Sequence, residues 1–130
     1  MCSAQTTSDL KVFLVEDSPL LAERIERMLD SVPGAKSVGR AEGAQAAIAA
    51  ILENRPDVVV LDLTLAQGSG YDVLRAVKAA DPGIDFYVLT NYASDPHRHL
   101  AGRLGASEFF DKSTEFGRMR ERLAERARPH

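Results

Sequence analysis

The stretch from Val58 to Leu65, which reads VVVLDLTL, decides the fold class of this chain. Its first four residues are apolar and mostly β-branched, a pattern that predicts a short strand buried on both faces. Strands of this kind occur in parallel sheets that have helices packed on either side. Asp62 follows the strand directly, at the end where open parallel sheets bind their ligands.

The same alternation of strand and helix continues in both directions from this stretch. Ser18 is placed to cap the first helix, with Pro19 at its first position. Five strands alternating with five helices predict a doubly wound α/β fold, with a five-stranded parallel sheet and right-handed crossovers. Apolar runs predict the other strands over residues 10–15, 36–41, 84–89 and 107–110. Helical spacing predicts helices whose apolar faces span residues 21–32, 44–52, 73–77, 96–104 and 116–123.

Length and composition indicate one globular domain. The 130 residues are 45% hydrophobic and 27% charged, and the formal net charge of −3 argues against a nucleic-acid-binding module. The single cysteine, Cys2, excludes a disulfide framework and indicates a reducing compartment. The polar start lacks a secretory signal, and the longest apolar run, residues 46–52, is too short for a membrane span. We expect a cytoplasmic protein that contacts no membrane and no nucleic acid directly, with a disordered tail over 1–9 and one domain over 10–128.

Polar side chains follow the predicted strands at one edge of the sheet. Each has a plain explanation as a cap or turn residue, but their coincidence at one edge indicates a site. Grouped carboxylates repel one another, and a divalent cation relieves that repulsion. Oxygen ligands without a nearby histidine or cysteine favour Mg²⁺ over zinc or copper. The residues in question are Glu16, Asp17, Asp62, Thr90, Asp111 and Lys112.

Besides carboxylates, this set contains one hydroxyl group and one ammonium group. Thr90 and Lys112 suit the oxygens of a phosphoryl group, as a short hydrogen-bond donor and a point charge. A carboxylate in that company can attack phosphorus and form an acyl phosphate. The residues by themselves therefore indicate phosphoryl chemistry that depends on a hard cation.

Over residues 10 to about 128 the sequence resembles the receiver domains of response regulators in two-component signalling, the CheY-like family. The resemblance implies a flavodoxin-like sheet with strand order 2-1-3-4-5. It rests on VEDSP at 15–19, VVVLDLTL at 58–65 with Gly70, VLT at 88–90, GA at 105–106 and FFDK at 109–112, all in the family's order.

The resemblance also implies partners and a mode of action. A sensor histidine kinase or a histidine phosphotransfer protein would supply the phosphoryl group. A stand-alone receiver would catalyse only its own phosphorylation and dephosphorylation. It would signal by phosphorylation-dependent contact with a downstream protein, whose identity the sequence does not give, or by phosphorelay. A phosphorylation-dependent homodimer is compatible with this scheme.

Family roles carry over to the matched positions of the metal site. Asp62 is the expected phosphoacceptor and also a metal ligand. Asp17 is expected to bind Mg²⁺ directly, and Glu16 to act as its acidic partner through water. The backbone carbonyl of Thr64 is the expected backbone ligand.

Roles for the phosphoryl group and the switch follow in the same way. Thr90 and Lys112 are expected to bind the phosphoryl group, and Phe109 occupies the position of the family's aromatic switch residue. Because phenylalanine has no hydroxyl, we expect packing alone to position this ring. The energy gap between its two positions should then be small, with an active-like state partly populated before phosphorylation.

Four positions depart from the common family pattern, and none removes a reactive group. Glu16 replaces the more frequent aspartate, and Ala66 stands where proline is frequent. Asn91 is bulkier than the usual small residue after the threonine, and Ser113 replaces the proline that usually follows the lysine. These departures bear on rates and loop geometry.

Three alternative functions fit the residues less well. A pseudo-receiver, which is not phosphorylated, usually lacks the acceptor, an acidic residue or the lysine, and this chain has all of them. A phosphatase of the haloacid dehalogenase type needs a second aspartate two residues after the nucleophile, where this chain has Thr64, and it needs a cap domain. A flavodoxin-like FMN protein needs a Gly/Ser/Thr-rich phosphate loop where this chain has Glu16 and Asp17.

Two other clusters of side chains have plain explanations. His97 and His99 are two residues apart and so point to different faces of a helix, and we expect exposed side chains rather than a metal site. For the last helix we favour a solvated face over nucleic-acid binding. Like charges four residues apart slightly destabilise this helix in isolation, which a partner surface could offset. Its arginines are residues 118, 120, 122, 126 and 128.

Overall fold

Strands and helices alternate along the chain in the predicted order. The computed structural model describes residues 9–65, 67–91 and 95–127. Residues 1–8 of the tail expected over 1–9, and residue 128 at the end of the expected domain, lie outside the described residues. The strands are β1 (Leu10–Val15), β2 (Ala35–Ala41), β3 (Val58–Leu61), β4 (Asp85–Thr90) and β5 (Glu108–Asp111). The helices are α1 (Pro19–Asp30), α2 (Ala44–Asn54), α3 (Gly70–Ala80), α4 (Asp95–Arg103) and α5 (Phe116–Ala127).

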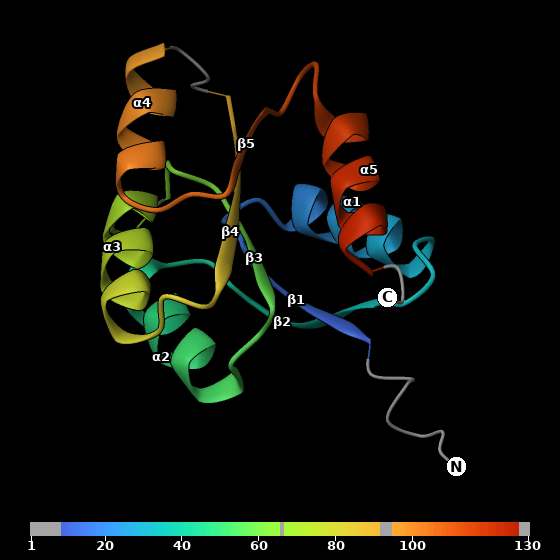
Figure 1. Ribbon diagram of the computed structural model, residues 1–130, viewed down its shortest axis with the longest axis horizontal. Coiled ribbons are helices and arrows are strands. Elements are labelled where there is room, and N and C mark those ends of the chain that lie inside the picture. The colour runs from blue at the N-terminus through green and yellow to red at the C-terminus, as the bar shows by residue number, and fades with distance from the viewer. Residues whose placement is uncertain (1–8, 66, 92–94, 128–130) are drawn as a thin grey trace.

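The five strands are parallel and form one sheet in the order β2-β1-β3-β4-β5. Helices α2, α3 and α4 cover one face of the sheet, and α1 and α5 cover the other (Figure 1). The strand order reverses between β1 and β3, so the carboxyl ends of these two strands meet where α/β sheets bind ligands. The predicted fold class and strand order are confirmed.

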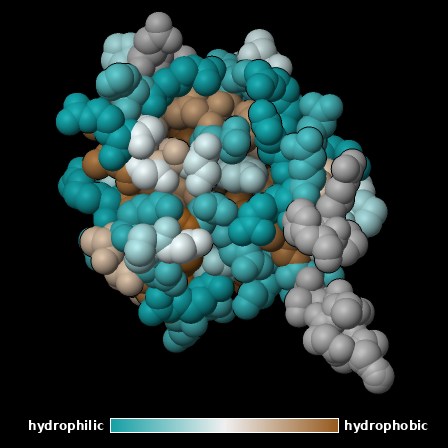
Figure 2. Space-filling model, viewed as in Figure 1, coloured by the Kyte–Doolittle hydropathy of each residue, from teal (hydrophilic) through white to brown (hydrophobic). Residues whose placement is uncertain are grey.

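Alternate residues of the central strands contribute to two separate cores. Phe13 and Val59 belong to the core beneath α2, α3 and α4, whereas Leu14 and Val60 belong to the core beneath α1 and α5. Strand β3 is buried along its whole length, as its uninterrupted apolar sequence predicts. Hydrophilic residues cover most of the face shown in Figure 2. Within the described part of the chain, no helix has the length and apolar character needed to cross a membrane.

The start of α1 is also as predicted. The Ser18 hydroxyl accepts a hydrogen bond from the Leu21 N–H at 3.3 Å, and Pro19 is the first helical residue. This cap fixes the direction in which the chain leaves β1, immediately after Glu16 and Asp17.

Two strands extend one residue beyond their predicted ends. The strands expected over 84–89 and 107–110 each lie one position further along the chain, as β4 and β5. Thr90 and Asp111 pair in register at their ends, and the Lys112 N–H donates to the Thr90 carbonyl at 3.0 Å. Backbone hydrogen bonds decide where these strands end, whereas the hydrophobic pattern stops at the last apolar residue.

Helix α3 begins against the backbone that follows β3, and a glycine makes this close approach possible. The N–H of Gly70, the first residue of α3, donates to the Leu63 carbonyl at 3.0 Å. A Cβ atom at this position would lie 2.6 Å from the Leu63 Cα and closer still to the Asp62 carbonyl oxygen. Both are backbone atoms of the segment that carries Asp62, so added bulk here would displace Asp62 itself.

We therefore expect Gly70→Ala to lower the free energy of unfolding by about 1–3 kcal/mol, the usual cost of overpacking. Gly117→Ala is a matched control, because a Cβ at that helical glycine would meet nothing within 4 Å. The control should be neutral or slightly stabilising, by less than about 1 kcal/mol. Urea denaturation of both variants measures the difference. Equal midpoints would contradict the close approach at Gly70.

Candidate functional site

The acidic residues predicted at the strand ends meet at one edge of the sheet. The Glu16 N–H donates to the Ala41 carbonyl at 3.1 Å, and the Asp62 N–H donates to the Val15 carbonyl at 3.0 Å. These bonds continue the sheet past its regular strands and fix the backbone of both residues. Carboxylate oxygens of Glu16, Asp17 and Asp62 lie within 4.8 Å of one another.

Lys112 connects two of these carboxylates. Its Nζ lies 3.0 Å from Asp62 Oδ2 and 3.1 Å from Glu16 Oε1. The side chains of Asp62 and Glu16 are only 5% and 4% exposed, so both ion pairs are largely shielded from water. Lys112 follows β5 directly, and its backbone N–H donates to the Thr90 carbonyl at the end of β4. The pairing of these two strands therefore fixes the position of Lys112.

Backbone N–H groups hold the second oxygen of each bridged carboxylate. The Thr64 N–H donates to Asp62 Oδ1 at 3.1 Å, and the Ser18 N–H donates to Glu16 Oε2 at 3.1 Å. Each carboxylate is therefore held at both oxygens, which fixes its orientation. Among the described residues, none forms a hydrogen bond or ion pair with the Asp17 carboxylate, so Asp17 keeps its oxygens available.

Burial and charge shift the ionisation of two groups in this cluster. Burial and the adjacent charge of Asp62 raise the pKa of Glu16, and the Ser18 N–H and Lys112 offset this only in part. Burial by itself would lower the pKa of Lys112. The hydrogen bond and charge of Asp62, with those of Glu16, outweigh burial and raise the pKa of Lys112, so this side chain is charged at neutral pH.

The donor set suits a hard divalent cation. Three carboxylates face one ammonium group, so negative charge is in excess in a partly buried place. All of the donors are oxygens, which Mg²⁺ prefers, and the half-buried Asp17 leaves one side of the cluster open toward water. Thr64 is exposed two residues after Asp62, in the loop where its carbonyl is predicted to act as a ligand.

Thr90 and Phe109 lie on the same face of the sheet. Thr90 is completely buried at the end of β4, and Phe109 pairs in register with Val88, two residues before Thr90. Because side chains alternate along a strand, the side chains of Thr90 and Phe109 both face α4. Phe109 is half-buried and packs against the core on that side.

Arg98 of α4 covers the ring of Phe109, which the sequence did not predict. Its guanidinium carbon lies 4.8 Å from the centre of the ring, and its Nη1 donates to the Phe109 carbonyl at 3.3 Å. The expectation that packing alone positions this ring is therefore wrong, because a cation lies over its π face. No sequence spacing links an arginine on α4 to a ring on β5.

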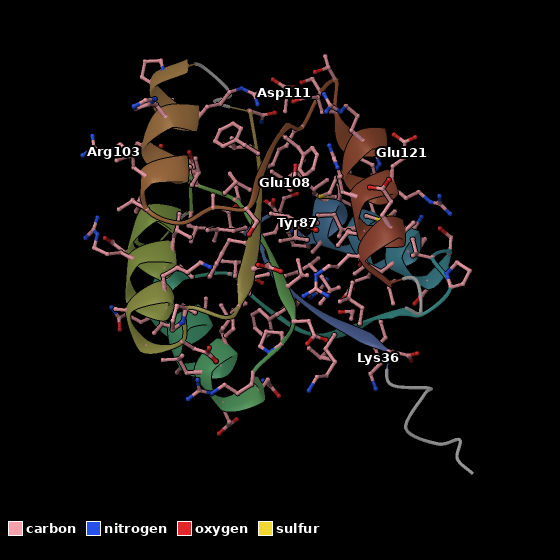
Figure 3. All side chains as sticks on the ribbon, viewed as in Figure 1. Lys36, Tyr87, Arg103, Glu108, Asp111 and Glu121 are labelled. Atoms are coloured by element: carbon pink, nitrogen blue, oxygen red, sulfur yellow. The ribbon has the colours of Figure 1, made fainter. Side chains whose placement is uncertain are left out.

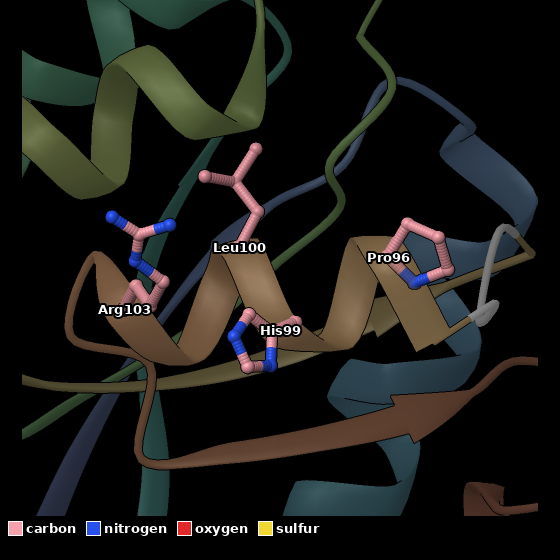
Figure 4. A pocket seen from close by; sticks show the side chains of 4 residues that line it. All are labelled: Pro96, His99, Leu100 and Arg103. Atoms are coloured by element: carbon pink, nitrogen blue, oxygen red, sulfur yellow. The ribbon is translucent and has the colours of Figure 1, made fainter.

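The expectation of exposed histidines holds for His99 and is wrong for His97. His97 is half-buried, with its Nδ1 2.6 Å from the Tyr71 hydroxyl and its ring stacked on the tyrosine. His99 is exposed and lines a shallow pocket of about 430 Å³ on α4, with Pro96, Leu100 and Arg103 (Figure 4). None of the acidic residues of the cluster lines this pocket.

The arginines of α5 find partners within the chain. Arg126 lies 3.2 Å from the Asp85 carboxylate and Arg122 lies 3.9 Å from that of Glu108, which Figure 3 labels on β5. Arg120 donates to the Ser31 carbonyl at 3.1 Å. Acidic residues of the sheet therefore offset the repulsion between like charges that the helix sequence predicts.

Comparison with known proteins identifies the family. The model of the response regulator receiver domain matches residues 12–124. The DNA-binding transcriptional activator DevR/DosR of Mycobacterium tuberculosis is 34% identical over 103 residues, which cover 79% of this chain and 48% of the activator. The protein-glutamate methylesterase/protein-glutamine glutaminase of Treponema denticola is 30% identical over 106 residues, 80% of this chain and 28% of that protein. The chain spans between about a quarter and a half of the length of these relatives.

Solved structures agree in fold over almost the whole chain. The response regulator domain of Thermotoga maritima CheB has a TM-score of 0.81 at 24% identity, covering 92% of this chain and 93% of that domain. A two-component response regulator of the LuxR family from Aurantimonas sp. SI85-9A1 has a TM-score of 0.86 at 27% identity, covering 92% and 86% of the two chains. With the family model matched over residues 12–124, the chain belongs to the CheY-like response regulator receiver domains of two-component signalling.

Proposed function

We propose that Asp62 accepts a phosphoryl group from a histidine kinase or a histidine phosphotransfer protein in a Mg²⁺-dependent reaction. The observation that carries this proposal is the buried Asp62 carboxylate, held by Lys112 at one oxygen and by the Thr64 N–H at the other, beside two further acids. We also propose residues 10–128 as the extent of the receiver domain. A cytoplasmic location, expected from the single cysteine, belongs to the same proposal.

The proposed chemistry is a displacement at phosphorus. A carboxylate oxygen of Asp62 attacks the phosphorus of phosphohistidine, and an O–P bond forms as the P–N bond breaks. The electron pair of the broken bond stays on the imidazole nitrogen of the donor. Because Lys112 and the Thr64 N–H fix both oxygens, Asp62 reaches this geometry with little reorganisation.

We assign the metal ligands from the acidic cluster. Asp17, Asp62 and the Thr64 carbonyl would hold Mg²⁺, with Glu16 acting through water, since both Glu16 oxygens are bonded to Lys112 and the Ser18 N–H. When bound, the cation supplies neutralisation of negative charge on the carboxylate and the phosphoryl oxygens. The excess of carboxylates over ammonium groups at this edge supports that assignment.

Lys112 and Thr90 bind the product in this proposal. Lys112 donates to Asp62 Oδ2 before transfer and can donate to a phosphoryl oxygen afterwards without a large movement. Thr90, at the end of the neighbouring β4, offers its hydroxyl to another oxygen. Water attack on the acyl phosphate then releases inorganic phosphate and restores Asp62, so the domain acts on its own phosphorylation only.

The output in this proposal is a phosphorylation-dependent contact with another protein, or transfer of the group along a phosphorelay. Movement of Thr90 toward the phosphoryl group would reach Phe109, because both side chains lie on the α4 face of the sheet. The surface around α4 and β5 would then differ between the two states. The relatives extend well beyond the part that this chain matches, and the activities in their names belong to those longer proteins.

Asp62→Asn should abolish labelling by acetyl phosphate in the presence of Mg²⁺, because the amide is a poor nucleophile. Intact-mass measurement should show one added phosphoryl group on the wild-type protein and none on the variant. Asp111→Asn is a matched control, because Asp111 ends at the same edge but is not part of the cluster of Glu16, Asp17 and Asp62. Its amide oxygen can still accept the hydrogen bonds that the Ser113 and Thr114 N–H groups donate to the carboxylate, so this variant should be labelled like the wild type. Equal labelling of Asp62→Asn and wild type would show that Asp62 is not the acceptor.

Asp17→Asn should weaken Mg²⁺ binding more than Glu16→Gln. No group of the described residues 9–65, 67–91 and 95–127 binds the Asp17 carboxylate, whereas Glu16 is already held at both of its oxygens. Titration of each variant with Mg²⁺, followed by amide NMR, gives the two dissociation constants. The reverse order would make Glu16 the direct ligand.

A further inference from the structure

Arg98 contacts three elements at once. From α4, its guanidinium lies over the Phe109 ring of β5 at 4.8 Å and donates to the Phe109 carbonyl at 3.3 Å. Its other terminal nitrogen, Nη2, donates to Glu115 Oε1 at 3.0 Å, just before the first residue of α5. One side chain thus joins α4, β5 and the start of α5.

Glu115 anchors this arginine to the backbone at the end of β5. The Asp111 N–H donates to Glu115 Oε1 at 2.9 Å, and Arg118 binds the other carboxylate oxygen at 3.1 Å. The Asp111 N–H and then Arg98 lower the pKa of Glu115, so its carboxylate is charged at neutral pH. Asp111 immediately precedes Lys112, so the contacts are continuous from Arg98 to the lysine that binds Asp62.

The orientation of these contacts favours one position of the ring. A cation is attracted to the face of an aromatic ring, and that attraction is lost when the ring turns away. Arg98 cannot follow the ring freely, since its two terminal nitrogens are bound to a backbone carbonyl and a carboxylate. The Arg98 guanidinium therefore stabilises the present position of the Phe109 ring, although phenylalanine has no polar group of its own.

We propose that Arg98 is a latch that holds Phe109 in its present position and opposes the active arrangement of the α4 and β5 surface. The inference rests on the proposed function, in which a phosphoryl group on Asp62 draws Thr90 and frees space for the ring. It replaces the expectation of an appreciable active-like population before phosphorylation. With a partly exposed guanidinium, the cation–ring contact alone should shift the population of the two ring positions by about two- to fivefold.

Arg98→Met tests the latch, because methionine keeps an unbranched side chain and removes the cation and the donors. The ring of Phe109 is followed by NMR of protein labelled at its phenylalanines, with Phe109→Leu used to assign the signal. Without phosphodonor or Mg²⁺, relaxation dispersion should show a population of the second ring position at least twofold larger than in the wild type. Glu115→Gln should change it in the same direction by less, because the amide oxygen can still accept the Asp111 N–H.

Arg103→Met is the matched control. Arg103 belongs to the same helix but lines the shallow pocket with Pro96 and His99, so the substitution removes equal charge without touching Phe109 (Figure 4). It should leave the ring population as in the wild type. An unchanged ring in Arg98→Met, or an equal change in Arg103→Met, would overturn the latch.

A second arm separates failure of the latch from failure of the proposed function. Beryllofluoride with Mg²⁺, a mimic of the phosphoryl group, should bring wild type and Arg98→Met to the same end state. If the mimic does not bind the wild type, the proposed function fails, while the comparison without ligand still decides the latch. If it binds and moves the wild-type ring while Arg98→Met starts from the wild-type position, only the latch fails.

Discussion

Three carboxylates gathered beside a single, half-buried ammonium group are the constraint on which the rest of this molecule depends. Like charges at this separation are tolerated only if the backbone prevents them from moving apart. Here β1 and β3 lie side by side, and hydrogen bonds beyond their regular ends fix Glu16 and Asp62 in place. Lys112 reaches both acids only because β5 ends at the same edge. The parallel sheet is therefore what brings this chemistry together.

The same edge is supported from behind by close backbone contacts. Gly70 lets α3 start directly against the segment that carries Asp62, and its N–H binds the Leu63 carbonyl. A residue with no side chain is thus as much a part of the site as the charged residues in front of it. The Asp62 carboxylate is fixed in orientation because both of its oxygens and its own backbone N–H are hydrogen-bonded.

Much of this arrangement could be predicted from the sequence, for physical reasons. An uninterrupted apolar strand such as β3 must be buried on both faces, which requires a parallel sheet, and polar residues after parallel strands must share an edge. The cluster of Glu16, Asp17 and Asp62 follows from that rule. The contacts of Arg98 with Phe109 and of His97 with Tyr71 could not be predicted. Each joins side chains of two different elements, and the helical and strand periods of a sequence relate only residues within one element. The ends of β4 and β5 were missed by one residue because backbone pairing continues into polar side chains.

The paired arginines of α5 have a consequence for how partners approach. Because Arg122 and Arg126 lie against Glu108 and Asp85, opposite charges nearly cancel over this helix when it is viewed from a distance. At physiological ionic strength the field of an exposed charge decays within about 8 Å, and that of a close pair decays sooner. Long-range attraction would therefore add little to the rate of encounter at α5, despite its arginine-rich sequence. A partner that docked on this side would be recognised by short-range fit, at an association rate that changes little with salt.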